Sequence, residues 1–148
     1  AAIIPHRAQG YRKLPDGTLR NSILADVSNK IPGGGLCGTA TDLARFAIAM
    51  QKDVLLKPES RAQMWTRQKL KDGTETNYGL GWSISTRNGR REIAHGGGQP
   101  RVATYLYLRP EDHCAVALMT NLEGAKLPDL ARRIADVAVQ SAGARSGN

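Results

Sequence analysis

The sequence is short of the residues that mark several common classes of protein. Aromatic residues make up 5% of the 148 positions, too few for the stacking surface of a single-stranded nucleic-acid binder. No apolar run approaches the roughly 18 residues that a membrane-spanning helix needs, so we expect no membrane span. The two cysteines, Cys37 and Cys114, lie far apart without metal or redox spacing. We expect them to be small apolar core residues, and a disulfide between them stays open.

Clustered charge of one sign is also missing, although the chain is basic. The net charge is +8, from 21 basic and 13 acidic residues, and no basic run is longer than a pair. Because a nucleic-acid patch normally needs such a run, we interpret the charge as solvated surface and expect no nucleic-acid partner. The three histidines show no paired ligand spacing, so we expect no metal and no cofactor: His6, His95 and His113.

The length suits one domain, and the local patterns predict an α+β fold. Residues 1–35 are rich in proline, glycine, asparagine and aspartate, which predicts an irregular segment with a turn at Asp16-Gly17. A helix is predicted after Thr39, which can form a capping box with Asp42. Its apolar residues at helical spacing are Leu43, Phe46, Ala47 and Met50. A second short helix is predicted from Pro58 through Trp65.

The period then changes from helix to strand. Bulky residues alternate with small ones from Tyr78 to Ile84, which predicts a first strand. Asn88-Gly89 predicts a hairpin that returns along residues 91–95. Two further strands are predicted over residues 102–109 and 114–121. Because both faces of these two strands are apolar, we expect the sheet to be covered on both sides.

A closing helix is predicted over residues 126–141, before a small, polar tail that we expect to fray. Its expected core face is Leu127, Leu130, Ile134 and Val137, and its expected wet face is Arg132, Arg133, Asp136 and Gln140. The whole, 1–148, is expected to be a single partial domain. It divides into an irregular segment plus helices over 1–70, antiparallel strands over 76–122 and the closing helix.

The strongest candidate for chemistry is the segment from His95 through three glycines to Gly98. Glycine loses more freedom on folding than other residues, so such a run is expected where the backbone turns or where a ligand approaches it closely. An HGGG loop forms the oxyanion hole of α/β-hydrolases, but that family also needs a later G-x-S-x-G element, which this sequence lacks. The earlier glycines at 33, 35 and 38 follow no strand, which excludes a dinucleotide-binding fingerprint.

Several segments, taken in order, resemble the C-terminal part of class C β-lactamase-like serine hydrolases. They are IPHRAQGY, IPGGGLCGTATDLARFAIAM, LLKPESRAQMW, YGLGW and AHGGGQPRVATYLYLRPEDHCAVALMTN, followed by the final helix. The superfamily also contains penicillin-binding D,D-peptidases, D-aminopeptidases and esterases. The resemblance, from about Ile4 to Ala138, implies the C-terminal part of the β-lactamase/transpeptidase-like fold, an antiparallel sheet of about four strands flanked by helices.

The resemblance also implies roles for individual residues. His95-Gly96-Gly97 match the K-T-G or H-x-G element that lines the family's cleft. The resemblance implies that the Gly98 N–H lies in the oxyanion hole. It also implies that His95 lies near the catalytic tyrosine and lysine, where the histidine assists proton transfer or polarises the site. Gly96 replaces a threonine whose hydroxyl holds a substrate carboxylate, so esters and peptides are expected as much as β-lactams. Gly96, Gly97 and Arg101 are expected to bind substrate. For Arg101 the alternative, that its side chain faces only water, stays open.

The family's nucleophile is missing from this chain. No serine is followed by lysine three residues later, and no tyrosine begins a Y-x-N element. Both elements lie upstream in the family and the sequence starts at Ala1, so we expect a piece that is not catalytic alone. Its expected partners are the N-terminal remainder of the same hydrolase or a second copy of the chain, with a small acyl substrate. Family members are often exported, and the compartment stays open.

Two alternatives remain at this point. The chain is also consistent with a non-catalytic binding or assembly module that retains this half of the fold. In either case a partial sheet would expose an edge strand and an apolar helix face, which invite pairing. For His95, the alternative is a structural hydrogen bond to a backbone carbonyl at the end of a strand.

Overall fold

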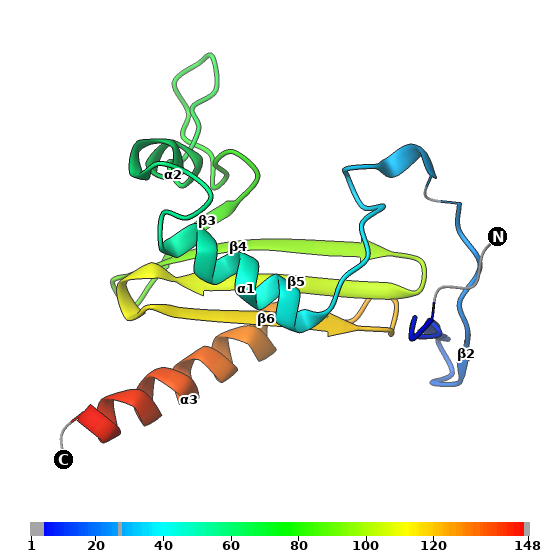
Figure 1. The fold of residues 1–148 in the computed structure, drawn as a ribbon. Helices are drawn as coiled ribbons and strands as arrows, with labels where there is room; N and C mark the ends of the chain where they lie inside the picture. The colour runs from blue at the N-terminus through cyan, green and yellow to red at the C-terminus, as the bar shows by residue number, and fades with distance from the viewer. Residues whose placement is uncertain (1–4, 27, 147–148) are drawn as a thin grey trace.

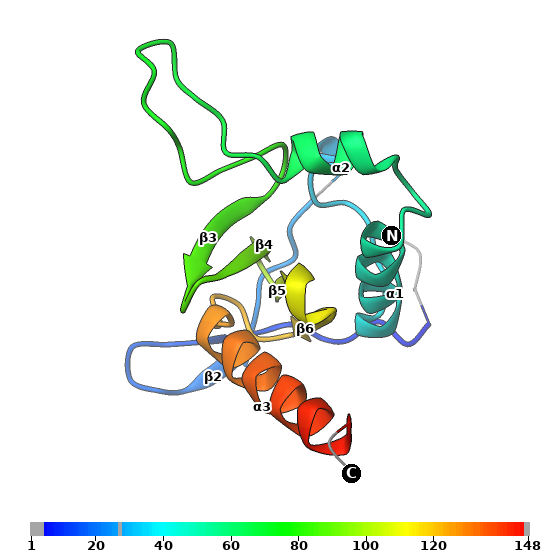
Figure 2. The same cartoon turned by 90° about the vertical axis from the view of Figure 1, so that its left-hand side faces the viewer.

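A four-stranded antiparallel sheet, in the order β3-β4-β5-β6, forms the centre of the protein (Figure 1). The computed structural model describes residues 5–26 and 28–146. The strands are β3 (Ser83–Arg87), β4 (Arg90–Gln99), β5 (Val102–Arg109) and β6 (Cys114–Thr120). The helices are α1 (Ala40–Gln51), α2 (Pro58–Met64) and α3 (Pro128–Ser146). Figure 2 shows α1 and α3 on opposite sides of the sheet, which confirms the α+β class and the expected cover on both faces.

The cap of α1 forms as the sequence predicts. Thr39 Oγ1 accepts a hydrogen bond from the Asp42 N–H at 3.1 Å, and the Asp42 carboxylate accepts one from the Thr39 N–H at 3.3 Å. Two of the first orphan N–H groups are thereby satisfied. The helix then buries Ala47 and Met50 against the sheet, beside Trp65 at the end of α2. Together they begin the larger of two apolar clusters.

The N-terminal segment is less irregular than predicted. The turn at Asp16-Gly17 closes a small hairpin of β1 (Tyr11–Lys13) and β2 (Leu19–Asn21). A 3-10 turn, η1 (Ser28–Lys30), follows. The expected core placement of the cysteines is wrong for one of them, because Cys37 is exposed. Cys114 is half-buried, both thiols are free, and burial raises the pKa of the Cys114 thiol.

The first strand of the sheet begins later than the alternating pattern predicts. The Gly79 N–H donates to the Trp82 carbonyl at 2.8 Å, and Gly81 has a φ of +82°. The chain therefore turns tightly between Tyr78 and Ser83, which are joined by an isolated bridge. The small residues of the predicted alternation include Gly81, whose positive φ allows this turn.

Strand β4, in contrast, is longer than predicted. Its hairpin with β3 turns at Asn88-Gly89, with φ of 51° and 74°, as the sequence predicts. The strand does not end at His95 but continues to Gln99, where a two-residue turn leads into β5. The glycine run is therefore inside a strand and not in a loop.

Helix α3 presents a different face to the sheet from the predicted one. The buried residues are Leu127, Ala131 and Ala135, whereas Leu130, Ile134 and Val137 are 45%, 40% and 63% exposed. The two alanines bring the helix close to Ala94, Tyr107 and Val116. The predicted core face is therefore right for Leu127 and wrong for Leu130, Ile134 and Val137. The helix also continues through Ser146, so the tail expected to fray is helical.

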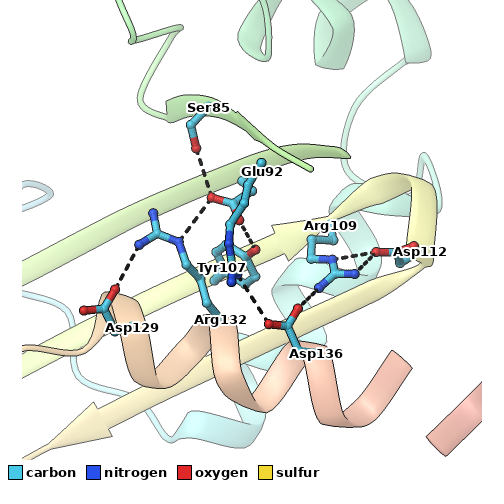
Figure 3. Close-up of polar contacts among 9 residues, drawn as sticks. Ser85, Glu92, Tyr107, Arg109, Asp112, Asp129, Arg132 and Asp136 are labelled. Carbon is cyan, nitrogen blue, oxygen red and sulfur yellow. Dashed lines mark hydrogen bonds and ion pairs between the residues drawn. The ribbon is translucent and has the colours of Figure 1, made fainter. Parts of the chain in front are cut away.

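A buried carboxylate explains this orientation (Figure 3). Glu92 of β4, whose side chain is 5% exposed, accepts hydrogen bonds from the Tyr107 hydroxyl at 2.7 Å and the Ser85 hydroxyl at 3.1 Å. Arg132 Nε of α3 donates to the same carboxylate at 3.2 Å. A buried charge is costly unless it is paired, so this contact turns Arg132 toward the sheet.

One turn later, Asp136 of α3 makes a second ionic contact with the sheet. Its carboxylate accepts from Arg109 Nη1 at 2.5 Å, and Arg109 also binds Asp112 (Figure 3). Arg109 is almost fully buried. Arg132 and Asp136 of the predicted wet face keep 32% and 38% of their side-chain surface exposed, and both also bind the sheet, so ion pairs rather than apolar side chains set the rotation of the helix.

Replacing Arg132 with methionine is expected to lower the free energy of unfolding by about 2 to 3 kcal/mol, because Glu92 then stays buried without its cation. Urea unfolding followed by circular dichroism measures the change. Arg133→Met is the matched control, since Arg133 is exposed on the same helix and its loss is expected to cost at most about 0.5 kcal/mol. Equal losses for the two variants would contradict the role of Glu92.

The stability of the chain is expected to fall above about pH 10. Burial, followed by the hydrogen bond to Glu92, raises the pKa of Tyr107 far above its ordinary value of 10.0. The unfolded chain therefore releases this proton first, so the stabilisation is complete below about pH 10 and is lost as the pH rises further. Urea midpoints between pH 8 and 11 measure it, and Tyr107→Phe should flatten the slope. An unchanged slope in that variant would refute the assignment.

Candidate active site

The second half of β4 lies at an open edge of the sheet. Strand β4 has 10 residues and β3 has 5, and their last pair is Ser83 with Ala94. On the other side, β5 follows β4 to its end, where Gln99 lies opposite Val102. Among the described residues, 95–99 are therefore paired with β5 and with no strand on the other side.

The hydrogen-bond pattern decides which of these residues face the open edge. A two-residue turn joins Gln99 to Val102, which makes them a hydrogen-bonded pair. Such pairs alternate along antiparallel strands with pairs that make no bond to each other. Gly98 and Gly96 lie in pairs that make no hydrogen bond to their partners on β5. Their N–H and carbonyl groups consequently point away from β5, toward the open edge.

The hairpin between β3 and β4 gives the same answer independently. Counting from its closing pair, Arg87 and Arg90, the alternation bonds Ser83 to Ala94 and leaves Ile84 unbonded to β4. The Ile84 N–H does donate on the far side, to the Asn77 carbonyl at 2.9 Å. The backbone N–H and carbonyl groups of the even-numbered residues of β4 thus point toward β3. Gly96 and Gly98 lie beyond the end of β3, so their N–H and carbonyl groups point outward.

The three glycines differ in what surrounds them. A Cβ added at Gly97 would lie 2.6 Å from Thr104 Oγ1, and one at Gly96 would lie 3.3 Å from the Tyr105 ring. At Gly98 it would meet nothing within 4 Å among the described residues. Internal packing therefore accounts for Gly97 but not for Gly98. At Gly98, the missing side chain leaves free space on the face of the strand, next to the outward-facing N–H.

His95 lies on the α1 side of the sheet and lines an apolar groove. Its ring is exposed and stands edge-on to the Tyr78 ring, with 6.5 Å between centroids. The groove has a volume of about 570 Å³, and its lining includes Leu43, Phe46, Met50, Trp82, Thr104 and Leu106. Phe46, one of the apolar residues at helical spacing in α1, lines this groove. Within the described part of the chain, no hydrogen bond reaches the His95 ring, so the predicted alternative of a structural bond finds no partner there.

Arg101 lies at the tip of the β4–β5 hairpin, with a φ of +84°. Its guanidinium donates to the Gln9 side chain at 3.0 Å, so in this structure it contacts the chain itself. Beside it, Gln99 Nε2 donates to the Gly34 carbonyl at 2.8 Å. The N-terminal segment therefore packs against the end of the strand that carries the glycines.

Three residues beside the site were not anticipated from the sequence: Tyr78, Gln99 and Thr104. Tyr78 begins the YGLGW segment, so a signal for it existed. The other two depend on strand register, which local patterns do not give. Among residues 5–26 and 28–146, no group of three His, Cys, Asp or Glu residues is placed to hold a metal ion. Within the same ranges, no helix has the length and apolar character to cross a bilayer.

Comparison with protein families matches residues 1–139 to the family model described as Beta-lactamase. The chain belongs to the beta-lactamase family. The human "Serine beta-lactamase-like protein LACTB, mitochondrial" is 28% identical over 136 residues, covering 74% of this chain and 25% of that protein. "Penicillin-binding protein 4*" of Bacillus subtilis (strain 168) is 28% identical over 120 residues, covering 74% of this chain and 26% of that protein. The chain spans about a quarter of the length of these curated relatives.

Solved structures share the beta-lactamase-family fold. A penicillin binding protein from Bacillus halodurans superposes with a TM-score of 0.61 at 19% identity, covering 84% of this chain and 38% of that one. A D-stereospecific amidohydrolase from Streptomyces sp. gives a TM-score of 0.65 at 20% identity, covering 82% and 37%. At these identities the likeness supports the fold alone.

Gly97→Ala is expected to destabilise this beta-lactamase-family chain by about 1 kcal/mol or more, because its Cβ would collide with Thr104. Gly98→Ala is the matched control and is expected to be neutral or slightly stabilising, since its Cβ meets open space. Thermal unfolding of both variants measures the difference. Adding Thr104→Ala should rescue the first variant and leave the second unchanged. A Gly98→Ala variant as unstable as Gly97→Ala would contradict the difference in packing between the two glycines.

Proposed function

We propose that this chain is the C-terminal part of a serine hydrolase of the beta-lactamase family and supplies one wall of its acyl-transfer site. The observation that supports this is the outward-facing N–H of Gly98, which points away from β5 and lies beyond the last residue pair of β3 with β4. A fixed N–H donor at such an edge stabilises the oxyanion that forms when a carbonyl is attacked. The fixed position costs nothing at the moment of reaction because the β4–β5 ladder already holds the strand.

The proposed reaction has two steps. A serine hydroxyl from another segment attacks the substrate carbonyl, and the negative charge forms on the carbonyl oxygen beside the Gly98 N–H. The leaving group then departs with a proton, which gives an ester with the serine. Water attacks this ester in the same way, releases the acid and restores the serine. His95, which lines the groove, is proposed to assist the proton transfers or to polarise the site.

The substrate is proposed to be an ester, an amide or a β-lactam. A bound acyl group would lie along Gly96 and Gly97, where no side chain projects from the strand. Gly96 lacks a hydroxyl for a substrate carboxylate, so esters and peptides are proposed as much as β-lactams. Arg101 is proposed as a carboxylate contact, which requires its bond to Gln9 to open.

The nucleophile is proposed to come from the N-terminal remainder of the same hydrolase. The relatives are about four times as long as the matched region, which leaves room for such a segment. The apolar groove beside His95 is where we propose that it packs, because groove residues such as Leu43 and Phe46 otherwise stay in contact with water. The chain is then a partial domain, with 1–148 forming one side of the cleft.

A second candidate is a binding or assembly module that keeps this half of the fold without catalysis. The observation that favours it is the sequence itself, which contains neither S-x-x-K nor Y-x-N. Both candidates use the groove and the open edge, and they differ in whether a serine-bearing partner exists.

Intact-mass spectrometry of the native protein, with hydrolysis assays, tests the proposal. The isolated chain, 16.0 kDa, is expected to cleave neither a chromogenic short-chain ester nor a chromogenic cephalosporin. A longer chain or a second polypeptide with S-x-x-K, together with serine-dependent hydrolysis, would support the enzyme. A single 16.0 kDa species that is silent on both substrates would favour the binding module.

Gly98→Pro in the complete enzyme tests the oxyanion role. Proline removes the outward N–H without removing a β4–β5 bond, and is expected to lower kcat by about 10²- to 10³-fold. Gly98→Ala keeps the N–H and serves as the matched control. A proline variant that is folded and as active as the alanine variant would contradict the proposal.

A further inference from the structure

The segment between α2 and β3 forms a long loop that projects away from the sheet (Figure 2). Near its base the two sides of the loop are joined, because the Gln68 N–H donates to the Tyr78 carbonyl and the Thr76 N–H donates to the Gln68 carbonyl, both at 2.8 Å. Tyr78 also forms an isolated bridge with Ser83, where β3 begins. The backbone of Tyr78 is therefore held between the loop on one side and the sheet on the other.

Two further contacts fix the chain around Tyr78. The Thr76 hydroxyl donates to the Tyr78 carbonyl at 3.0 Å and accepts from the Tyr78 N–H at 3.3 Å. The next residue, Gly79, packs so closely on the end of α2 that an added Cβ would lie 2.1 Å from the Met64 carbonyl oxygen. The Leu80 N–H donates to that same oxygen at 3.0 Å. The position of Tyr78 is thus set by α2, by the loop and by β3 together.

This position brings the ring of Tyr78 against the ring of His95. The ring planes are inclined at 61° and the centroids are 6.5 Å apart, within the range of roughly 4.5 to 7 Å that edge-on aromatic pairs prefer. Among residues 5–26 and 28–146, no other ring contact, hydrogen bond or ion pair reaches the His95 side chain. Within that part of the chain, the directional contact that the imidazole makes is therefore the one with Tyr78.

We propose that Tyr78 is a positioning residue for His95 and holds the imidazole in the orientation that proton transfer at the acyl-transfer site requires. The inference rests on the proposed function, because it gives the contact a role in that reaction. An edge-on pair favours one orientation of the imidazole by up to about tenfold. Because the contact uses the ring and no hydrogen bond, both imidazole nitrogens stay free. One serves the proton in transfer, and the other serves a polar group of the N-terminal remainder.

The alternative role for Tyr78 is to shield the neighbouring groove from water. Leu80 and Trp82, which belong to the same turn, line that groove, and Tyr78 itself is 42% exposed. A shielding side chain needs only apolar bulk, which leucine also has, whereas an edge-on contact needs a ring. Phenylalanine keeps the ring and removes only the hydroxyl, to which no described residue bonds. Substitutions to leucine and to phenylalanine therefore separate the two roles.

Steady-state kinetics of the complete enzyme with a chromogenic short-chain ester test the proposal. Tyr78→Leu is expected to lower kcat by about 10-fold with KM nearly unchanged, because the orientation of His95 matters in the transition state and not in substrate binding. Tyr78→Phe is expected to keep the wild-type kcat. Tyr11→Leu is the matched control, since Tyr11 is 38% exposed and lies on β1, outside the groove lining. It is expected to change neither constant.

Two results of these assays would overturn the proposal. A Tyr78→Leu enzyme as active as wild type, beside an impaired His95→Ala enzyme, would show that the ring contact has no role in the reaction. A Tyr78→Phe enzyme as impaired as Tyr78→Leu would assign the effect to the hydroxyl instead. Circular dichroism and thermal unfolding verify that each variant keeps its fold.

A double variant tests whether Tyr78 acts through His95. In the His95→Ala enzyme, Tyr78→Leu is expected to have no further effect on kcat, since no imidazole remains to be positioned. A second loss, equal to the one that Tyr78→Leu causes in the wild-type enzyme, would overturn the proposal.

NMR of the complete protein, labelled at histidine, tests the contact without relying on hydrolysis. The signal that His95→Ala removes identifies the His95 ring. Tyr78→Leu is expected to shift this signal through the loss of the tyrosine ring current, whereas Tyr78→Phe is expected to leave it nearly in place. An unmoved signal in the leucine variant would overturn the proposal. A shifted signal together with full activity of His95→Ala would instead refute the proposed role of His95, and the positioning role with it, while the contact itself stands.

Discussion

The early end of β3 is the constraint on which the candidate site depends. If the register of the β3–β4 hairpin continued backward, Gly79 and Gly81 would lie opposite Gly98 and Gly96 and would bond to them. Instead, the chain turns at Gly81 and places Trp82 in the core. The outward backbone groups of β4 are therefore not paired with β3. A regular sheet over the same residues would leave no outward N–H for the proposed oxyanion role.

The ionic contacts beneath α3 determine how the rest of the molecule is arranged around that strand. Glu92 lies on β4 three residues before His95, and its bonds to Tyr107 and Arg132 join the site strand to its neighbour and to the helix. A buried carboxylate tolerates few geometries, since each unpaired lone pair is costly. The same contacts leave Leu130, Ile134 and Val137 of α3 exposed, on the flank of the helix away from β4. This one cluster therefore supports the strand that carries the candidate site and also exposes an apolar face of α3.

The features predicted correctly from the sequence are those that a few neighbouring residues determine. The Thr39 cap, the Asn88-Gly89 turn and the limits of β5 follow from a few adjacent residues, and the structure has them as predicted. The buried face of α3 was predicted wrongly, because apolar periodicity favours Leu130 and Ile134 while distant partners on β4 and β5 decide the outcome. The strand predicted over Tyr78 to Ile84 begins only at Ser83. Bulky residues that alternate with glycines are typical of a strand, but the same pattern also occurs where a glycine at positive φ makes a tight turn, as Gly81 does.

The candidate site was found from the sequence only in outline. The run from His95 to Gly98 signals close approach to a backbone, and the family match over residues 1–139 places the chain in the beta-lactamase family. Which glycine faces a ligand depends on the turn at Pro100-Arg101 and on the point where β3 ends, and neither is visible in the glycine run itself. The distinction between Gly97, packed under Thr104, and the uncovered Gly98 required the structure.

A crystal structure of the complete enzyme, inactivated at its serine by a phosphonate ester, tests the central claim most directly. The account predicts that the phosphonyl oxygen accepts a hydrogen bond from the Gly98 N–H at about 2.7 to 3.1 Å, with His95 beside the bound group. A phosphonyl oxygen held by other donors, with the Gly98 N–H in water or paired to another strand, would contradict it.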